Sequence, residues 1–107
     1  MGQTGSYRER RQRRDEFRAL QELEYHYSAT AGTLSKRLNL HADRCRTALE
    51  TLEENNLVEV LDIIYKWEQP YSLTSEGFEA LRRLEQWYDQ SWRQRRRSTP
   101  PPLVTST

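Results

Sequence analysis

Apolar residues recur at three- and four-residue intervals in four stretches of the chain, which is the spacing of amphipathic helices. From about Arg8 the chain is rich in helix formers, and after a basic arm the apolar face of the first helix is formed by Phe17, Leu20, Leu23 and Tyr27. The small and polar side chains of YSATAG, which follows, end it. The sequence therefore predicts one amphipathic helix with a break after it.

Two shorter helices are predicted next, joined by a tight turn. Thr30 is a good N-cap for the first, because its side-chain oxygen can accept a hydrogen bond from a free backbone N–H. Leu34 and Leu38 then share one face of this helix, and Asn39 suits the left-handed backbone of the turn. The second helix runs from about residue 42 to 55, and its buried face is formed by Cys45, Ala48, Leu49 and Leu52.

The second half of the chain predicts a hairpin followed by a long helix. LVEVLDIIY (57–65) is a strand, KWEQP (66–70) is a turn, and YSL (71–73) can return as an antiparallel strand. Thr74 caps a last helix that runs from about Ser75 to the low nineties, where the prolines of STPPP end it. The order is helix, helix, helix, strand, strand, helix, so the predicted fold class is α+β, mainly α, with a long C-terminal helix.

The length of 107 residues supports one domain. We place it at residues 15–92, between a partly disordered basic N-terminal arm (1–14) and a basic, proline-containing disordered tail (93–107). The single cysteine, Cys45, excludes an internal disulfide, and no apolar run is long enough to span a membrane. Because no signal peptide is visible either, an intracellular, cytoplasmic protein is expected.

The net charge of +1 conceals an uneven distribution. Residues 1–18 carry a net charge of +3 and residues 93–107 carry +4, whereas the residues between them carry −6. Both basic ends are built from arginine, whose forked guanidinium can grip a phosphate at two points. The two ends are interpreted either as arms that contact phosphates or as solvated tails.

Three segments carry a resemblance to a known group of proteins. TAGTLSKRL (30–38) resembles the first helix of a helix-turn-helix, and LHADRCRTALETLEENNLVEV (40–60) resembles a recognition helix with the first wing strand. YSLTSEGFEAL (71–81) resembles the second wing strand and the next helix, where a Leu-Thr-x-x-Gly signature is typical. The chain thus resembles, over about residues 15–92, the winged helix-turn-helix transcription regulators, which include the MarR, PadR and ArsR families and many archaeal and viral repressors. The resemblance implies a dimeric repressor of transcription that binds double-stranded DNA.

The sequence departs from the pattern of these regulators at two places. The usual Gly-Leu-Val after the recognition helix is replaced here, and Asn56 stands where a glycine C-cap is normal. The wing, DIIYKWEQPY, has Lys66 as its single base and also contains Asp62 and Glu68. We therefore do not expect the wing to contribute strongly to DNA binding.

The resemblance assigns DNA reading to the N-terminal part of the third helix. Arg44 and Arg46 are expected to contact phosphates or guanine, and Thr47 a phosphate or a thymine methyl group. Asp43 has two interpretations, as an acceptor for a cytosine amino group or as a negative charge at the helix N-terminus. The predicted DNA-binding set is completed by His41, Lys66, Lys36 and Arg37 for backbone phosphates, and the end residues Arg10, Arg11, Arg13, Arg14, Arg95, Arg96 and Arg97.

The last helix has more apolar surface than one face requires. It either packs on the first helix or pairs with a copy of itself. In the regulators that the chain resembles, terminal helices commonly form the dimer interface, so a homodimer is expected. The predicted interface consists of Leu81, Leu84, Trp87, Tyr88 and Trp92. Twofold symmetry then predicts an inverted-repeat DNA site.

No pattern in the sequence indicates an enzyme. There is no P-loop, nucleophile elbow or paired-carboxylate arrangement, and no cofactor is expected. His26 and His41 lack a neighbouring cysteine pair or a carboxylate at a ligand spacing, so no metal site is expected.

Two other functions remain open beside sequence-specific regulation. A winged helix can serve protein assembly, with Trp67 at the wing tip and the acidic face contacting a partner. Alternatively, the arginine-rich ends can bind DNA or RNA without sequence preference, through phosphate neutralisation.

Overall fold

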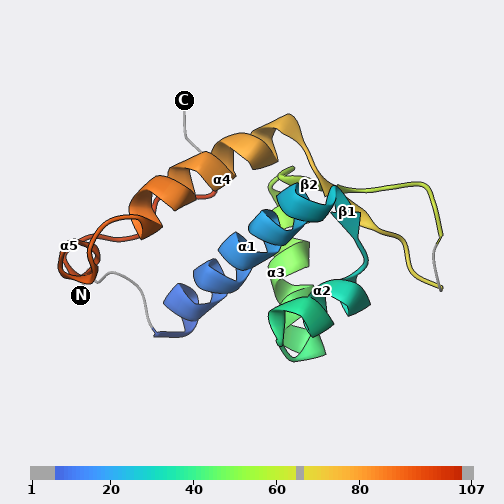
Figure 1. Ribbon diagram of the computed structural model, residues 1–107, viewed down its shortest axis with the longest axis horizontal. Coiled ribbons are helices and arrows are strands. Elements are labelled where there is room, and N and C mark those ends of the chain that lie inside the picture. The colour runs from blue at the N-terminus through green and yellow to red at the C-terminus, as the bar shows by residue number, and fades with distance from the viewer. Residues whose placement is uncertain (1–6, 65–66, 105–107) are drawn as a thin grey trace.

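The computed structural model describes residues 7–64 and 67–104 (Figure 1). A small sheet lies at one end of four longer helices, and a short fifth helix lies at the far end of the fourth. In chain order, the elements of the described part are α1 (Tyr7–His26), β1 (Ser28–Ala29), α2 (Ala31–Leu38), α3 (Ala42–Glu54), β2 (Val58–Val60), β3 (Tyr71–Leu73), α4 (Ser75–Tyr88) and α5 (Trp92–Arg96).

The sheet is antiparallel, with the strand order β1-β3-β2. β2 and β3 form the predicted hairpin, in which Val58 pairs with Leu73, although β2 is shorter than the predicted strand. β1 was not predicted, because its two residues are too few to show an alternating pattern. It forms because β3 offers its second edge, where Ser28 pairs with Ser72. The predicted winged-helix order and the α+β, mainly α, class are confirmed.

Four predicted capping and turn residues are confirmed. The side-chain oxygen of Thr30 accepts a hydrogen bond from the N–H of Thr33 (3.2 Å) at the start of α2. Thr74 caps α4 in the same way. Asn39 (φ 55°) and Asn56 (φ 62°) both adopt the left-handed backbone that allows α2 and α3 to end sharply.

The core lies where α1, α3 and α4 meet. It consists mainly of leucines that are almost completely buried, and each contributes roughly 1.5–3 kcal/mol by leaving water. The largest are Leu20, Leu23, Leu34, Leu49, Leu52, Leu57, Leu81 and Leu84. Cys45 is also buried, as predicted, and burial raises the pKa of its thiol, so it is not a reactive thiolate.

Leu81 and Leu84, which were predicted to lie in a dimer interface, are buried inside a single chain. Both side chains are fully buried (0% exposed) in the core of a single chain, where α4 packs on α1. Tyr88 also faces α1, because its ring stacks on Phe17 with 4.4 Å between the ring centroids. A helical spacing of apolar residues shows that a face is covered, but it does not show which element covers it. Of the predicted residues, Trp92 is the most open, at 55% exposed.

The last predicted helix is in fact two helices. α4 ends at Tyr88, and a new helix begins after Ser91, whose hydroxyl accepts a hydrogen bond from the N–H of Gln94 (3.3 Å). The Gln94 side chain accepts in return from the N–H of Ser91 (3.2 Å). This reciprocal capping box starts a new helix at residue 92, so the longer helix predicted from apolar spacing is divided in two.

Both basic ends also differ from the predicted arms. The arginines from Arg8 to Arg14 lie within the first half of α1 and do not precede it. Residues 97–104 have no regular secondary structure, as expected, but they are not a free tail. Leu103 is buried, and its carbonyl accepts a hydrogen bond from Arg83 of α4 (2.6 Å). Among the described residues, no helix is both long enough and apolar enough to cross a lipid bilayer.

Candidate nucleic-acid interface

The exposed face of α3 is basic only at its start. Arg46 and Thr47 lie on this face, opposite the buried side of the helix. In the second half, the exposed side chains Glu50, Glu53 and Glu54 are all acidic. Because these carboxylates repel a polyanion, only the first half of α3 suits contact with DNA.

Arg44, which was predicted to contact DNA, is held in an ion pair in the structure. Its Nε and Nη2 atoms donate to the two carboxylate oxygens of Asp15 at 3.0 Å and 2.7 Å. The Asp15 side chain is 4% exposed, and the pair joins α1 to α3. The hydrogen bond to Asp15 raises the pKa of Arg44, so the guanidinium keeps its charge. In this geometry Arg44 attaches α3 to α1.

His41 and Asp43 form the N-terminus of α3. The Nδ1 atom of His41 accepts a hydrogen bond from the N–H of Asp43 (3.1 Å), which makes His41 the N-cap. Asp43 lies in the first helical turn, and its carboxylate is 3.7 Å from Nη1 of Arg46, with both side chains largely exposed. Of its two interpretations, the geometry favours the charge at the helix N-terminus. The pair with Arg46 is loose, so the guanidinium can turn toward another anion.

Basic side chains border the start of α3 on two sides. Lys36 and Arg37 are exposed in the last turn of α2, just before the turn into α3. On the other side, Arg8 and Arg11 of α1 share a shallow pocket with Thr47. The first half of α3 is thus flanked by cations from two different helices. Arg11 was predicted to contact DNA from an arm before the first helix, and the structure places it on α1 itself.

The two basic ends, which are more than 80 residues apart in the chain, meet in space. Arg10, Arg11 and Arg14 of α1 and Arg95 and Arg96 of α5 line the same pocket. In Figure 1, α5 lies at the same end of the molecule as the start of α1. Arg13 is engaged elsewhere, with Glu16, and Arg97 is exposed after the end of α5.

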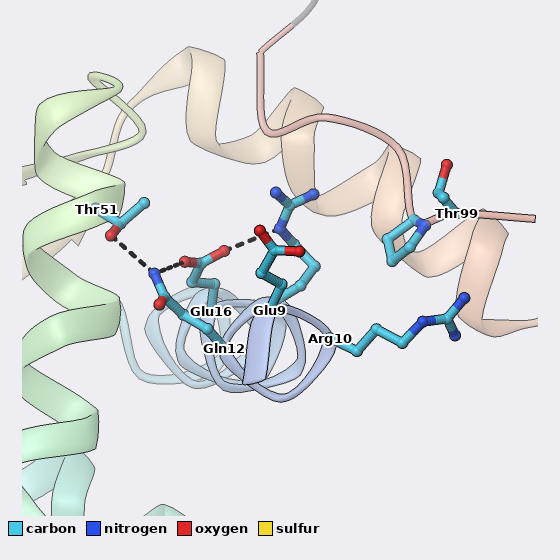
Figure 2. A pocket seen from close by; sticks show the side chains of 8 residues that line it. Glu9, Arg10, Gln12, Glu16, Thr51 and Thr99 are labelled. Carbon is cyan, nitrogen blue, oxygen red and sulfur yellow. Dashed lines mark hydrogen bonds and ion pairs between the residues drawn. The ribbon is translucent and has the colours of Figure 1, made fainter. Parts of the chain in front are cut away.

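A second pocket, shown in Figure 2, lies between α1, α3 and residues 99–100. Glu16 is almost fully buried beside it and accepts hydrogen bonds from Gln12 (2.8 Å) and Arg13 (3.0 Å). Gln12 also donates to the hydroxyl of Thr51 (3.0 Å), so this network, like the Asp15–Arg44 pair, connects α1 to α3. Burial raises the pKa of Glu16 above its ordinary value, although both hydrogen bonds act in the opposite direction.

We expect Glu16→Gln to remove part of the pH dependence of folding. Because the pKa of Glu16 is raised in the folded state above 4.5, its contribution to stability is fully present below that pH and is lost as the pH rises through the folded pKa. The free energy of unfolding of the variant minus that of the parent should therefore be larger at pH 7 than at pH 4. Urea unfolding at the two pH values measures this difference. Glu54→Gln, at an exposed position on α3, is the control. The prediction is contradicted if the pH-dependent difference for Glu16→Gln equals that of the control or has the opposite sign.

The described part of the wing is apolar and acidic. Ile63, Ile64 and Trp67 are 62%, 72% and 96% exposed. Glu68 turns back toward α2, where its carboxylate accepts a hydrogen bond from the N–H of Gly32 (3.2 Å). Lys66, the one predicted DNA-binding residue of the wing, lies outside the described residues.

The described residues contain no group of three or more His, Cys, Asp or Glu side chains that could hold a metal ion. Sequence reasoning missed three contributors to the interface region: Asp15 as the partner of Arg44, and Trp87 and Trp92 as walls of the pocket where α1 and α5 meet. Only the pattern of a capping box at Ser91 would have shown in advance that α5 is a separate helix.

No protein-family model matches the chain, and no curated protein matches it in sequence. Solved structures with a similar fold include a MarR family regulator from Neisseria meningitidis, at 22% identity and a TM-score of 0.54 over 59% of this chain and 45% of that chain. They also include the Staphylococcus aureus MarR in complex with salicylate and kanamycin, at 21% identity and 0.56 over 77% and 63% of the chains. A MepR-like protein complexed with pseudoligands matches at 17% identity and 0.56 over 78% and 66%. This chain thus spans between 45% and 66% of the length of these proteins and shares their winged-helix fold.

Proposed function

We propose that this protein is a transcription regulator that binds double-stranded DNA through the first half of α3. The observation that carries the proposal is the position of Arg46 and Thr47, which are exposed on the helix of this fold that enters the major groove. Arg8 and Arg11 of α1 border the same place. Base contacts from α3 and phosphate contacts from the flanking helices then supply specificity and affinity separately.

The acidic residues of α3 orient this docking. Glu50, Glu53 and Glu54 repel the DNA backbone from the second half of the helix, so the duplex approaches the end that begins at His41. Phosphate neutralisation by the arginines of α1 and by Lys36 compensates for the acidic body of the molecule. The described residues of the wing include no Lys or Arg, so the wing is not assigned a role in DNA contact.

The regulator acts, in this proposal, as a cytoplasmic homodimeric repressor. Leu81 and Leu84 are used inside one chain, so the dimer contact must come from what remains exposed on α4, such as Phe78 at 43%. Twofold symmetry then requires two half-sites in inverted repeat. Sedimentation of the protein alone and with DNA determines whether two chains bind one site.

We expect Arg46→Ala to weaken specific DNA binding by about five- to a hundredfold, because a base contact by arginine is worth about 1–3 kcal/mol. The measurement is fluorescence anisotropy with a duplex selected from a randomised library and with a scrambled duplex of equal composition, each at two salt concentrations. Arg82→Ala is the matched control, since Arg82 is exposed on α4 and pairs with Glu24 and Glu85. Failure to select any duplex, or equal losses on both duplexes, would count against sequence-specific reading through α3.

Protein assembly is the second candidate, and it is favoured by the apolar wing. Ile63, Ile64 and Trp67 expose their side chains together with the acidic half of α3. A winged helix that docks on a protein predicts little affinity for any duplex. The anisotropy experiment therefore separates the two functions, because the assembly role gives no binding to either duplex.

A further inference from the structure

The end of the molecule where α1 begins and α5 lies contains an arginine-lined pocket of about 260 Å³. Its wall is formed by five arginines, Arg10, Arg11, Arg14, Arg95 and Arg96, and no carboxylate is found among the described residues that line it. Like charges gathered in one pocket without a counter-charge are unfavourable in the free protein. A bound anion would relieve this repulsion, and the planar guanidinium fork can donate two hydrogen bonds to the oxygens of one phosphate.

Neutral groups hold two of these arginines in position. Arg95 donates from Nη1 to the carbonyl of Tyr88 (3.2 Å), and its guanidinium lies 5.9 Å from the centroid of the Trp87 ring. Arg10 donates to the carbonyl of Ser98 (3.4 Å), and the Trp87 indole N–H donates to the hydroxyl of the same serine (3.0 Å). These contacts fix the two guanidinium groups in place without pairing them with a carboxylate, so their positive charge remains available to an anion.

Aromatic rings complete the pocket. Tyr7 and Trp92, which are 80% and 55% exposed, stand at its edge, and Trp87 and Tyr88 lie deeper. The guanidinium groups of Arg96 and Arg93 lie over the Trp92 ring, at 5.2 Å and 5.8 Å from its centroid, so flat guanidinium surfaces cover the indole at the edge of the pocket. Open aromatic rings and guanidinium planes are the surfaces on which unpaired bases stack.

We propose that the arginine-lined pocket binds one unpaired nucleotide, with its phosphate among the arginines and its base against Trp92 or Tyr7. A base pair within a duplex offers no free ring face, so the pocket is distinct from the duplex site at α3. The nucleotide has two possible sources, a single-stranded nucleic acid or a free nucleotide. The inference does not depend on the proposed function, because the two sites share no residue that the experiments below alter.

The test uses the full chain and the fluorescence of its own tryptophans. A thymidine pentanucleotide with a 5′-phosphate is titrated into the protein, and thymidine monophosphate, inorganic phosphate and a blunt duplex are added as competitors. We expect binding of the pentanucleotide, a loss of at least about fivefold in Trp92→Ala, and no change in Trp67→Ala, the control at the opposite end. Arg96→Ala is the second variant, and circular dichroism establishes that each variant is folded.

The competitors and variants distinguish the possible ligands. Competition by thymidine monophosphate identifies a free nucleotide as a ligand, whereas binding of the pentanucleotide alone identifies a single strand. Equal competition by inorganic phosphate or by the duplex, or full affinity in Trp92→Ala, overturns the proposal. We expect Arg46→Ala to leave pentanucleotide binding unchanged. The Arg46 and Trp92 variants therefore distinguish failure of this proposal from failure of the DNA-regulator proposal.

Discussion

Gly77→Ala should unfold the protein or lower its melting temperature by about 15 °C or more. A Cβ atom at residue 77 would stand 2.0 Å from the carbonyl oxygen of Leu57 and 3.1 Å from the carbonyl carbon. Both are backbone atoms, so no side-chain rotation relieves the clash, and α4 would have to move away from the start of β2. We expect a loss of about 4 kcal/mol or more, which is exceptional for one methyl group.

Thermal unfolding followed by circular dichroism measures this effect. Gly32→Ala is a matched control, because a Cβ there would meet the Glu68 carboxylate at 2.8 Å, and this is the end of a flexible side chain that can turn away. Gly32 also lies inside α2, where alanine is the better helix former by about 1 kcal/mol. Gly32→Ala should therefore change stability little or raise it. A melting temperature for Gly77→Ala within a few degrees of the parent would refute the close contact.

The same contact gives a physical reason for the Leu-Thr-x-x-Gly segment noticed in the sequence. The Thr74 hydroxyl accepts a hydrogen bond from the N–H of Gly77 (3.0 Å) and donates to the carbonyl of Asn56 (2.6 Å). The N–H of Thr74 donates to the carbonyl of Leu57 (3.1 Å). Threonine thus joins the start of α4 to the end of α3, and glycine permits the close approach that these bonds require.

Features that depend on a few neighbouring residues were predictable from the sequence. Thr30 and Thr74 cap their helices, and Asn39 and Asn56 adopt left-handed backbones, because each outcome depends on local hydrogen bonding and sterics. The order of helices and the hairpin followed from periodicity for the same reason. The break at Ser91 was also local, and only the stronger apolar spacing of residues 78–92 concealed it.

Features that depend on packing were not predictable. Arg44 and Arg46 both lie at the flanks of α3 by helical spacing, but the crossing of α1 over α3 brings only Arg44 to Asp15. Periodicity likewise could not show whether Leu81 meets α1 or a second chain. The meeting of α1 and α5 at one pocket needed the break after Tyr88, so two basic segments that looked like separate arms became one surface.

Arg44→Ala is expected to cost roughly 2–3 kcal/mol of folding stability, because it leaves the Asp15 carboxylate buried without its partner. This value is below the 3–5 kcal/mol that is usual for breaking a fully buried pair, since the Arg44 side chain is 37% exposed and part of its interaction is screened by water. Arg46→Ala, two positions along the same helix, removes only a loose surface pair and should change stability by less than about 0.5 kcal/mol. Urea unfolding of both variants gives the comparison.

A double-mutant cycle with Asp15→Ala tests the assignment further. Asp15→Ala leaves Arg44 able to reach solvent, so it should cost less than Arg44→Ala, and removing both partners should cost less than the sum of the single changes. The same variants separate structure from DNA reading. At a temperature where every variant is folded, Arg44→Ala should keep duplex affinity within about twofold of the parent, whereas Arg46→Ala should lose about fivefold or more. If Arg44→Ala instead kept its stability and lost DNA binding, the assignment would be wrong. Arg44 would then contact DNA, and its ion pair with Asp15 would form only in the free protein.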